Sequence, residues 1–292
     1  TTGNENVAIG KVSLDANTSG VKNVGVGKYT LSGNTSGGSN TAVGDQALFA
    51  NTTASNNTAV GKFALKLNTT GTQNTAVGAL ALDANTTASF NTAIGYASLS
   101  ENTTGSQNVA IGVLTLDANT TGNSNVGIGV NCLTDNTTGD NNIGVGREAL
   151  FVNSTGASNV AVGYRSLQAN TTANNNTAVG TDTLKVNTTG ANNVAVGSLA
   201  LDANTTGNKN VAIGKGSLSA NTTAHDNVAI GGEALLVNTT GTLGTAVGSN
   251  ALAANTTGNS NTALGANSML VNTTGQDNVA VGRATLDANT TG

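Results

Sequence analysis

Short β-branched segments alternate with Leu-Asn-Thr-rich segments at a constant interval along the whole chain. In Val7-Ala8-Ile9 and again in Thr41-Ala42-Val43, a small residue stands between two β-branched ones. Alternation over such a short run predicts a β-strand. No apolar stripe of helical period runs through the repeat, and Gly and Asn occur too often for a stable helix. The pattern therefore predicts an all-β chain.

The interval between repeats is 17 residues throughout. One Gly marks the same point in every copy, at Gly10, Gly27, Gly44, Gly61, Gly78 and so on to Gly282. Seventeen copies without insertion or deletion, with three leading residues, account for all 292 residues. Constant length is typical of a solenoid, where an added residue would break the closure of a coil. We predict a parallel β-solenoid or β-roll in which residues 1–292 form a single array of seventeen 17-residue coils, one coil per repeat.

The positions of the repeat differ in what they accept. We number them from the Asn four residues before the recurring Gly, so that coil 1 begins at Asn6. Position 1 is Asn in every copy except at Gly244, position 3 is always Ala or Gly, and position 9 is Leu except at Met269. Positions 2 and 4 are β-branched or Leu, and they lie on the strand face opposite to position 3. We expect positions 2, 4 and 9 to fill the interior. Position 3 should then pack against either the opposite wall of the coil or a neighbouring chain.

Two corners and two columns of Asn follow from the repeat. The Gly at position 5 is expected to turn the first corner with a positive φ. The segment Asn-Thr-Thr-Gly is expected to form the second, because Asn tolerates left-handed backbone. Coils stacked about 4.8 Å apart place each Asn over the last, which predicts amide ladders at positions 1 and 12. The structural residues so predicted are Asn17, Asn34, Asn51, Asn68, Asn85, Asn102 and Asn119 of position 12, with the corner residues Gly10, Gly27, Gly44, Gly61 and Gly78.

A thin interior favours association of chains. Three aliphatic side chains per coil, worth roughly 1.5–3 kcal/mol each when buried, offset only part of the cost of ordering 17 residues. The exclusion of large residues from position 3 indicates close packing there as well. Both features favour a homotrimer wound about a common axis.

The amino-acid composition argues against several classes of function. One His, one Cys and 9% charged residues provide little material for catalysis, so the chain is not expected to be an enzyme or to bind a cofactor. A net charge of −4 without a basic stripe argues against a nucleic-acid partner. No run of 18 apolar residues exists, so no membrane span is expected.

Individual reactive residues have ordinary structural explanations. Asp recurs at position 10, as in Asp83 and Asp117, but never in adjacent coils, so no calcium ladder is predicted. His225 stands beside Asp226 at a variable position without a second His, as expected for a solvated corner. Cys132 replaces a small residue at position 8, which favours a buried, unreactive thiol. We therefore predict no metal, cofactor or catalytic site.

Repeated polar and aromatic residues leave further interpretations open. Every coil contains a formal glycosylation sequon, but sugars about 4.8 Å apart would clash, which favours a structural role for its Asn. The Thr columns at positions 13 and 14 allow an ice-binding interpretation, although a flat ice-binding face needs Thr at alternate positions. The aromatic residues occupy variable positions and are expected on the outer surface or in contacts between rods: Tyr29, Tyr96, Tyr164, Phe49, Phe63, Phe90 and Phe151.

Several segments resemble repeats of known families. Asn6-Val7-Ala8-Ile9-Gly10 and Asn227-Val228-Ala229-Ile230-Gly231 resemble the head repeats of trimeric autotransporter adhesins. The fuller unit, as in Asn74-Thr75-Ala76-Val77-Gly78 with Leu82 and Asn85-Thr86-Thr87, is similar to phage and bacterial tail-fibre repeats. The resemblance implies a trimeric parallel β-roll on a bacterial or virion surface. The 17-residue coil is longer than the usual adhesin coil, so handedness does not carry over.

These observations lead to one expected function and two alternatives. The expected function is a rigid spacer or shaft in an extracellular tail-fibre-like or adhesin-like protein, at a cell surface or on a virion. Its partner would be other copies of itself, together with a host-cell or surface receptor that the sequence does not identify. The alternatives are a self-assembling extracellular filament subunit and an ice-binding β-solenoid.

Overall fold

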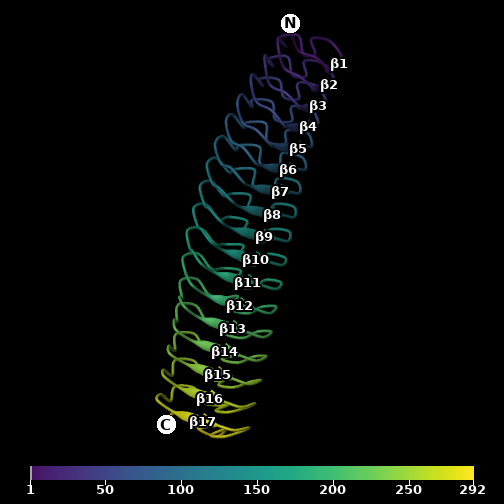
Figure 1. Ribbon diagram of the computed structural model, residues 1–292. Coiled ribbons are helices and arrows are strands. Elements are labelled where there is room, and N and C mark those ends of the chain that lie inside the picture. The colour runs from purple at the N-terminus through teal and green to yellow at the C-terminus, as the bar shows by residue number, and fades with distance from the viewer. Residues whose placement is uncertain (1) are drawn as a thin grey trace. The chain divides into compact units, whose positions relative to one another are not determined.

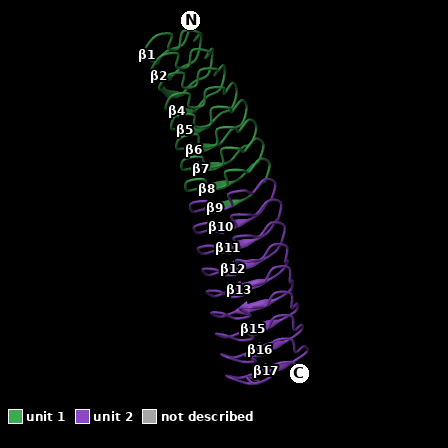
Figure 2. Ribbon diagram, turned by 180° about the vertical axis from the view of Figure 1, so that it is seen from behind, with its two compact units in different colours: residues 1–144 green, residues 145–292 purple. Residues whose placement is uncertain are grey.

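The computed structural model describes residues 2–292, and among them strands are the only regular elements. The chain divides into two compact units, residues 1–144 and residues 145–292, coloured separately in Figure 2. Each coil contributes one strand of three residues (Figure 1). Each unit is therefore described as its own stack of coils.

The strands recur every 17 residues. The first unit contains β1 (Val7–Ile9), β2 (Val24–Val26), β3 (Thr41–Val43), β4 (Thr58–Val60), β5 (Thr75–Val77), β6 (Thr92–Ile94), β7 (Val109–Ile111) and β8 (Val126–Ile128). The boundary between the units falls within β9 (Ile143–Val145). The second unit contains β10 (Val160–Val162), β11 (Thr177–Val179), β12 (Val194–Val196), β13 (Val211–Ile213), β14 (Val228–Ile230), β15 (Thr245–Val247), β16 (Thr262–Leu264) and β17 (Val279–Val281).

Successive strands within each unit pair in parallel, one repeat apart. In the first unit Val24 lies opposite Thr41, and in the second Thr177 lies opposite Val194. Equal repeat lengths place like positions side by side, and every ladder keeps this register. The prediction of an all-β parallel solenoid with one 17-residue coil per repeat is confirmed.

The direction of the strand side chains corrects one expectation. Position 3 points into the coil, where Ala42 and Ala59 are fully buried. Positions 2 and 4 point outward, and Ile94 and Ile111 retain 38% and 36% of their surface. Position 9 does fill the interior, as expected, and Leu65 and its equivalents in coils 1–16 are buried. The prediction that positions 2 and 4 fill the interior was therefore wrong.

The opposite wall of the solenoid explains the small residue at position 3. A Cβ added at Gly25 would lie 2.6 Å from Ser13 Oγ and 3.0 Å from Thr30 Oγ1, both at position 8. The Leu14 Cδ1 atom would be 3.6 Å away. Position 3 is small because positions 8 and 9 occupy the space in front of it, and no neighbouring chain is needed to account for it.

The corner prediction is only partly correct. The Gly at position 5 does have a positive φ, for example 128° at Gly44 and 136° at Gly61. Among the described residues, no Asn at position 12 has a positive φ. The left-handed residues stand at positions 7, 9 and 17, as in Gln46, Leu48 and Asn56, with φ values of 58°, 51° and 62°.

Hydrogen bonding along the stack explains these left-handed residues. The Gln46 N–H donates to Lys28 O of the preceding coil at 2.9 Å, whereas the Leu48 N–H donates to Ala64 O of the following coil at 3.1 Å. Backbone N–H groups only two residues apart thus donate to the coils on opposite sides. A left-handed non-Gly residue costs roughly 1–2 kcal/mol, and these bonds between coils compensate for it.

Candidate functional site

The Asn at position 12 form a continuous column in each unit. Asn102 Nδ2 donates to Asn85 Oδ1 of the preceding coil at 3.1 Å and to Gly105 O of its own coil at 2.9 Å. Asn119 Nδ2 donates in turn to Asn102 Oδ1 at 2.9 Å. Side-chain links of 2.8–3.1 Å join, in order, Asn17, Asn34, Asn51, Asn68, Asn85, Asn102 and Asn119. The residues predicted for this ladder lie in one column.

The Asn at position 1 form a second column that uses the backbone. The Asn108 N–H donates to Asn91 Oδ1 at 2.9 Å, and Asn108 Nδ2 donates to Gly122 O at 2.8 Å. Asn119 Nδ2 donates to the same Gly122 carbonyl at 3.1 Å. The position-15 carbonyl therefore accepts one hydrogen bond from each column, and these buried side-chain amides hold the coil closed.

The corner Gly residues lie directly over one another. A Cβ added at Gly27 would lie 2.7 Å from Gly44 O and 2.9 Å from Gly44 C, both backbone atoms of the next coil. The φ of Gly27 is 134°, a conformation that other residues rarely adopt. Position 5 thus requires Gly both for its backbone conformation and for the close approach of the coils. The same two features recur at Gly10, Gly44, Gly61 and Gly78.

One copy interrupts the position-1 ladder. The Gly244 N–H donates to Asn227 Oδ1 at 2.8 Å, as in other coils. Gly244 has no side chain to accept the Asn261 N–H or to donate to Gly258 O. Gly258 O keeps the bond from Asn255 Nδ2 at 3.0 Å. This coil therefore has fewer closing hydrogen bonds than the others.

We expect Gly244→Asn to raise the free energy of unfolding by about 1–3 kcal/mol. Two added hydrogen bonds contribute about 1 kcal/mol each, and loss of Gly from the unfolded chain contributes several tenths more. A Cβ at this position would lie 3.1 Å from Asn227 Oδ1 and 3.5 Å from Leu235 Cδ1, so a small shift accommodates it. Denaturant unfolding measures the gain. Gly244→Ala supplies the backbone effect alone, and equal stability of the two variants would contradict the ladder explanation.

The outward strand residues form an uncharged and largely apolar surface, the strand face, made of positions 2 and 4, with Thr at position 2 in seven coils. Position 4 is Val, Ile or Leu in all coils, and no charged residue occurs at position 2 or 4. Ile94, Ile111 and Ile128 are each more than a third exposed. Parallel sheets are normally covered on both sides. The strand face is therefore the part of the coil that most needs a covering partner.

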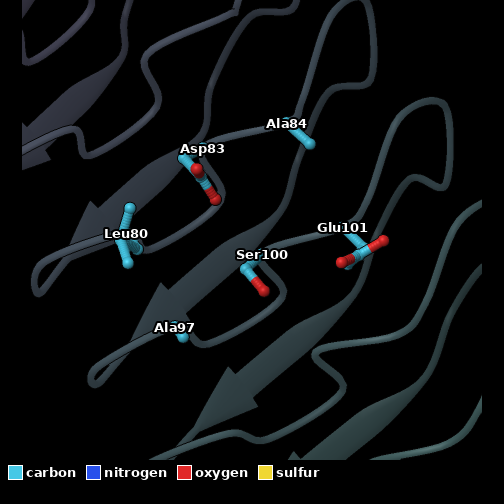
Figure 3. A pocket seen from close by; sticks show the side chains of 6 residues that line it. All are labelled: Leu80, Asp83, Ala84, Ala97, Ser100 and Glu101. Atoms are coloured by element: carbon cyan, nitrogen blue, oxygen red, sulfur yellow. The ribbon is translucent and has the colours of Figure 1, made fainter.

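A second surface, the loop face, consists of positions 6, 7, 10 and 11. In the first unit it has an open hollow of about 310 Å³ between coils 5 and 6 (Figure 3). Its lining residues are Leu80, Asp83, Ala84, Ala97, Ser100 and Glu101. The lining of the hollow thus combines three apolar side chains with a hydroxyl group and two carboxylates.

Burial raises the pKa of two carboxyl groups on the loop face. Partial burial raises the pKa of Asp83, and the nearby Glu101 carboxylate adds to this effect, against the opposing influence of Lys66. Partial burial also raises the pKa of Asp117, and Asp135 and Glu101 contribute repulsion. Like charges therefore accumulate in this part of the face, and Lys66 opposes their effect only at Asp83.

Coils 2–4 contain a contrasting cluster of Lys and aromatic rings, which we call the basic-aromatic patch. Lys28 Nζ lies 4.9 Å from the centroid of the Tyr29 ring. Lys62 Nζ and Lys66 Nζ each lie 4.7 Å from the centroid of Phe63. Phe49 meets the Tyr29 ring edge to face at 6.4 Å. The patch is defined by Lys28, Tyr29, Phe49, Lys62, Phe63 and Lys66. The aromatic residues were expected on the outer surface, but their clustering with Lys was not predicted.

The Cys132 side chain is buried, as predicted. Burial raises the pKa of its thiol to about 12, with a small opposing effect from a hydrogen bond to Ile128. Relative to an ordinary thiol with a pKa near 9, the thiolate fraction at pH 8 falls about a thousandfold. We expect a thiol reagent at pH 8 to label the unfolded chain at least that much faster than the native chain. Comparable labelling rates with and without denaturant would contradict this.

The remaining candidates form no site. His225 Nδ1 lies 2.7 Å from Asp226 Oδ2 on the surface, as expected for a solvated corner. Across residues 2–292 no three His, Cys, Asp or Glu side chains are grouped as metal ligands. In the same residues there is no helix long and apolar enough to cross a membrane.

Comparison with known proteins adds no family assignment. No family model matches the chain. No curated protein sequence matches it significantly.

Proposed function

We propose that the chain is a non-enzymatic, rigid segment of an extracellular fibre, tail-fibre-like or adhesin-like, that works as a homotrimer at a cell surface or on a virion. The observation that carries this proposal is the strand face. Each coil exposes apolar side chains from a parallel strand, in register with those of its neighbours. A long uncharged surface of this kind is suited to covering by identical chains.

Stiffness is the mechanical part of the proposal. A typical coil is joined to its neighbours by a strand pair, by position-12 side chains and by position-1 side chains, the last being absent at Gly244. In such a stack stability is approximately a sum of nearest-neighbour terms, and length grows with the number of copies. A spacer needs both properties, and neither requires a catalytic group.

The trimer follows from the strand face rather than from position 3. Three parallel chains around a common axis would each direct the same face inward, so that like positions meet at every level. The columns include Ile94, Ile111 and Ile128, which would then be covered. Because the three chains would run in the same direction with equally spaced coils, each coil would meet the equivalent coils of the other two chains.

The Thr columns favour the fibre over the ice-binding alternative. Thr103 Oγ1 donates to Thr120 O of the next coil at 3.1 Å, and Thr120 Oγ1 donates to Thr137 O at 3.1 Å. The position-13 hydroxyls are thus engaged along the stack. A role in joining coils accounts for the repetition of these residues.

Sedimentation equilibrium tests the proposal. We expect the wild-type chain, with a monomer mass of 28.4 kDa, to sediment at three times that mass or a multiple of it. Ile111→Lys combined with Ile128→Lys should reduce the mass threefold while the circular dichroism spectrum is preserved. Val237→Lys, at a similarly exposed residue of the second unit that lies outside the strand face, is the matched control. A folded wild-type monomer would refute the trimer, and a broad distribution of very large masses would favour the filament alternative.

A further inference from the structure

Charge on the loop face of the first unit is divided by coil. Coils 1–4 place on this face Lys11, Lys28, Lys62 and Lys66, with Asp15 and Asp45. Coils 5–8 place on it Asp83, Glu101, Asp117 and Asp135, and they contain no Lys or Arg at all. One half of the surface is therefore predominantly basic and the adjoining half is entirely acidic.

The basic half has cations that lie over aromatic rings and form no ion pair in the described part of the chain, although Lys66 is near enough to Asp83 of the next coil to lower its pKa. Lys28, Lys62 and Lys66 lie over aromatic rings, and among residues 2–292 none of the three has a carboxylate oxygen within 4.0 Å. Phe49 projects between them at 37% exposure. The basic-aromatic patch thus offers both positive charge and an exposed ring.

The acidic half has the complementary shape and charge. Position 7 is Phe63 in coil 4 and Leu80 in coil 5 but only Ala97 in coil 6, which leaves the hollow open between coils 5 and 6 (Figure 3). The side chains that line it are apolar at Leu80, Ala84 and Ala97, and Asp83 and Glu101 add two carboxylates. An apolar ring flanked by cations matches this site.

We propose that the loop face of the first unit pairs with the same face of a second copy, in antiparallel orientation about a two-fold axis between coils 4 and 5. Coil 4 then faces coil 5 of the second copy, coil 3 faces coil 6 and coil 2 faces coil 7. Lys66 and Asp83, both at position 10, then face each other, and Phe49 faces the hollow. Lys28, at position 6, lies at the level of Asp117, at position 10, rather than directly opposite it. The symmetry makes each of these contacts twice.

A second copy fits this surface better than an acidic polymer does. An acidic polysaccharide would neutralise coils 2–4 but would meet repulsion from Asp83, Glu101 and Asp117, which begin in the next coil. It would also leave the hollow unfilled. The strand face takes no part, so the pairing joins two fibres side by side and goes beyond the proposed spacer role.

Charge exchange tests the pairing on the full chain. Sedimentation equilibrium at about 20 mM salt should give twice the mass found at about 1 M salt, because screening weakens the exposed pairs. Lys66→Glu and Asp83→Lys should each halve the mass at low salt, and the double variant should restore the wild-type value. Lys209→Glu, a charge change at position 17 of the second unit, is the matched control and should keep the doubled mass.

The outcomes separate this proposal from the trimer. The pairing doubles the mass of the species present at high salt, whether that species is a trimer or a single chain. The double variant Ile111→Lys with Ile128→Lys should therefore still double its mass at low salt. Equal masses for wild type and Lys66→Glu would overturn the pairing. Failure of the double variant to restore the mass would overturn the register. Binding of a soluble acidic polysaccharide to coils 2–4, without salt-sensitive doubling, would assign the patch to a different partner.

Discussion

Replacing Gly197 by Ala is expected to destabilise the second unit by about 4 kcal/mol. The φ of Gly197 is 130°, so the new side chain meets an unfavourable backbone conformation. Its Cβ would lie 2.7 Å from both C and O of Gly214 and 3.1 Å from Lys215 N. These are backbone atoms of the next coil, so relief requires the coils to separate. Thermal unfolding and hydrogen exchange of coils 12 and 13 measure the loss.

Gly232→Ala is the control for this substitution. Gly232 follows a corner Gly, has no positive φ, and a Cβ added to it would meet nothing within 4 Å. Alanine there should be neutral or should stabilise by up to about 1 kcal/mol, through the unfolded chain. If both variants lost the same stability, close stacking of the corner Gly column would not be the reason for its constancy.

The coil, its length and its register could be predicted because they depend on periodicity alone. A constant 17-residue interval forces Asn85 to lie beside Asn102, whatever the details of the corners, since like positions of parallel coils must stack. The need for Gly at position 5 could also be predicted, because a residue that is always Gly is typical of a special backbone conformation. Repetition within one chain supplied this information without any related sequence.

The inward direction of the strand could not be predicted by the same means. Alternation shows that Val43 and Ala42 lie on opposite faces, but not which of them points inward. The assumption that the larger strand residues, at positions 2 and 4, point inward was wrong, because Leu48 is left-handed and fills the interior from the opposite wall. Left-handed Leu is rare enough that propensity argues against it. A physical signal was nevertheless present: only Ala and Gly at position 3 are small enough to face that Leu.

The loop face shows a further limit of periodic reasoning. Repetition highlights positions that do not vary, whereas the basic-aromatic patch and the hollow depend on residues that change from coil to coil, such as Phe63 and Ala97. Their grouping becomes visible only when positions 7 and 10 are known to lie together, as the Tyr29–Phe49 ring contact shows. Variable positions therefore determine the features of the loop face, and invariant ones determine the fold.

Loss of one ladder amide is the second large effect that we expect. Asn102→Ala removes two donated hydrogen bonds, to Asn85 Oδ1 and Gly105 O, and the acceptor of the bond from Asn119 Nδ2. Because the site is fully buried, water cannot replace these partners. We expect a loss of about 3 kcal/mol, measured by denaturant unfolding, with faster hydrogen exchange centred on coils 5–7.

Two further variants determine whether the donor itself is responsible. Thr104→Ala, at an exposed position of the same coil, should change stability by less than about 0.5 kcal/mol. Asn102→Asp keeps the size and the acceptor but replaces the amide donor with a buried carboxyl, whose pKa burial should raise. Its destabilisation should therefore be greatest at neutral pH and should shrink as the pH falls below that raised pKa, because the protonated carboxyl is uncharged and regains one donor. If Asn102→Asp were as stable as the wild type at pH 7, the amide column would be a consequence of stacking rather than a cause of it.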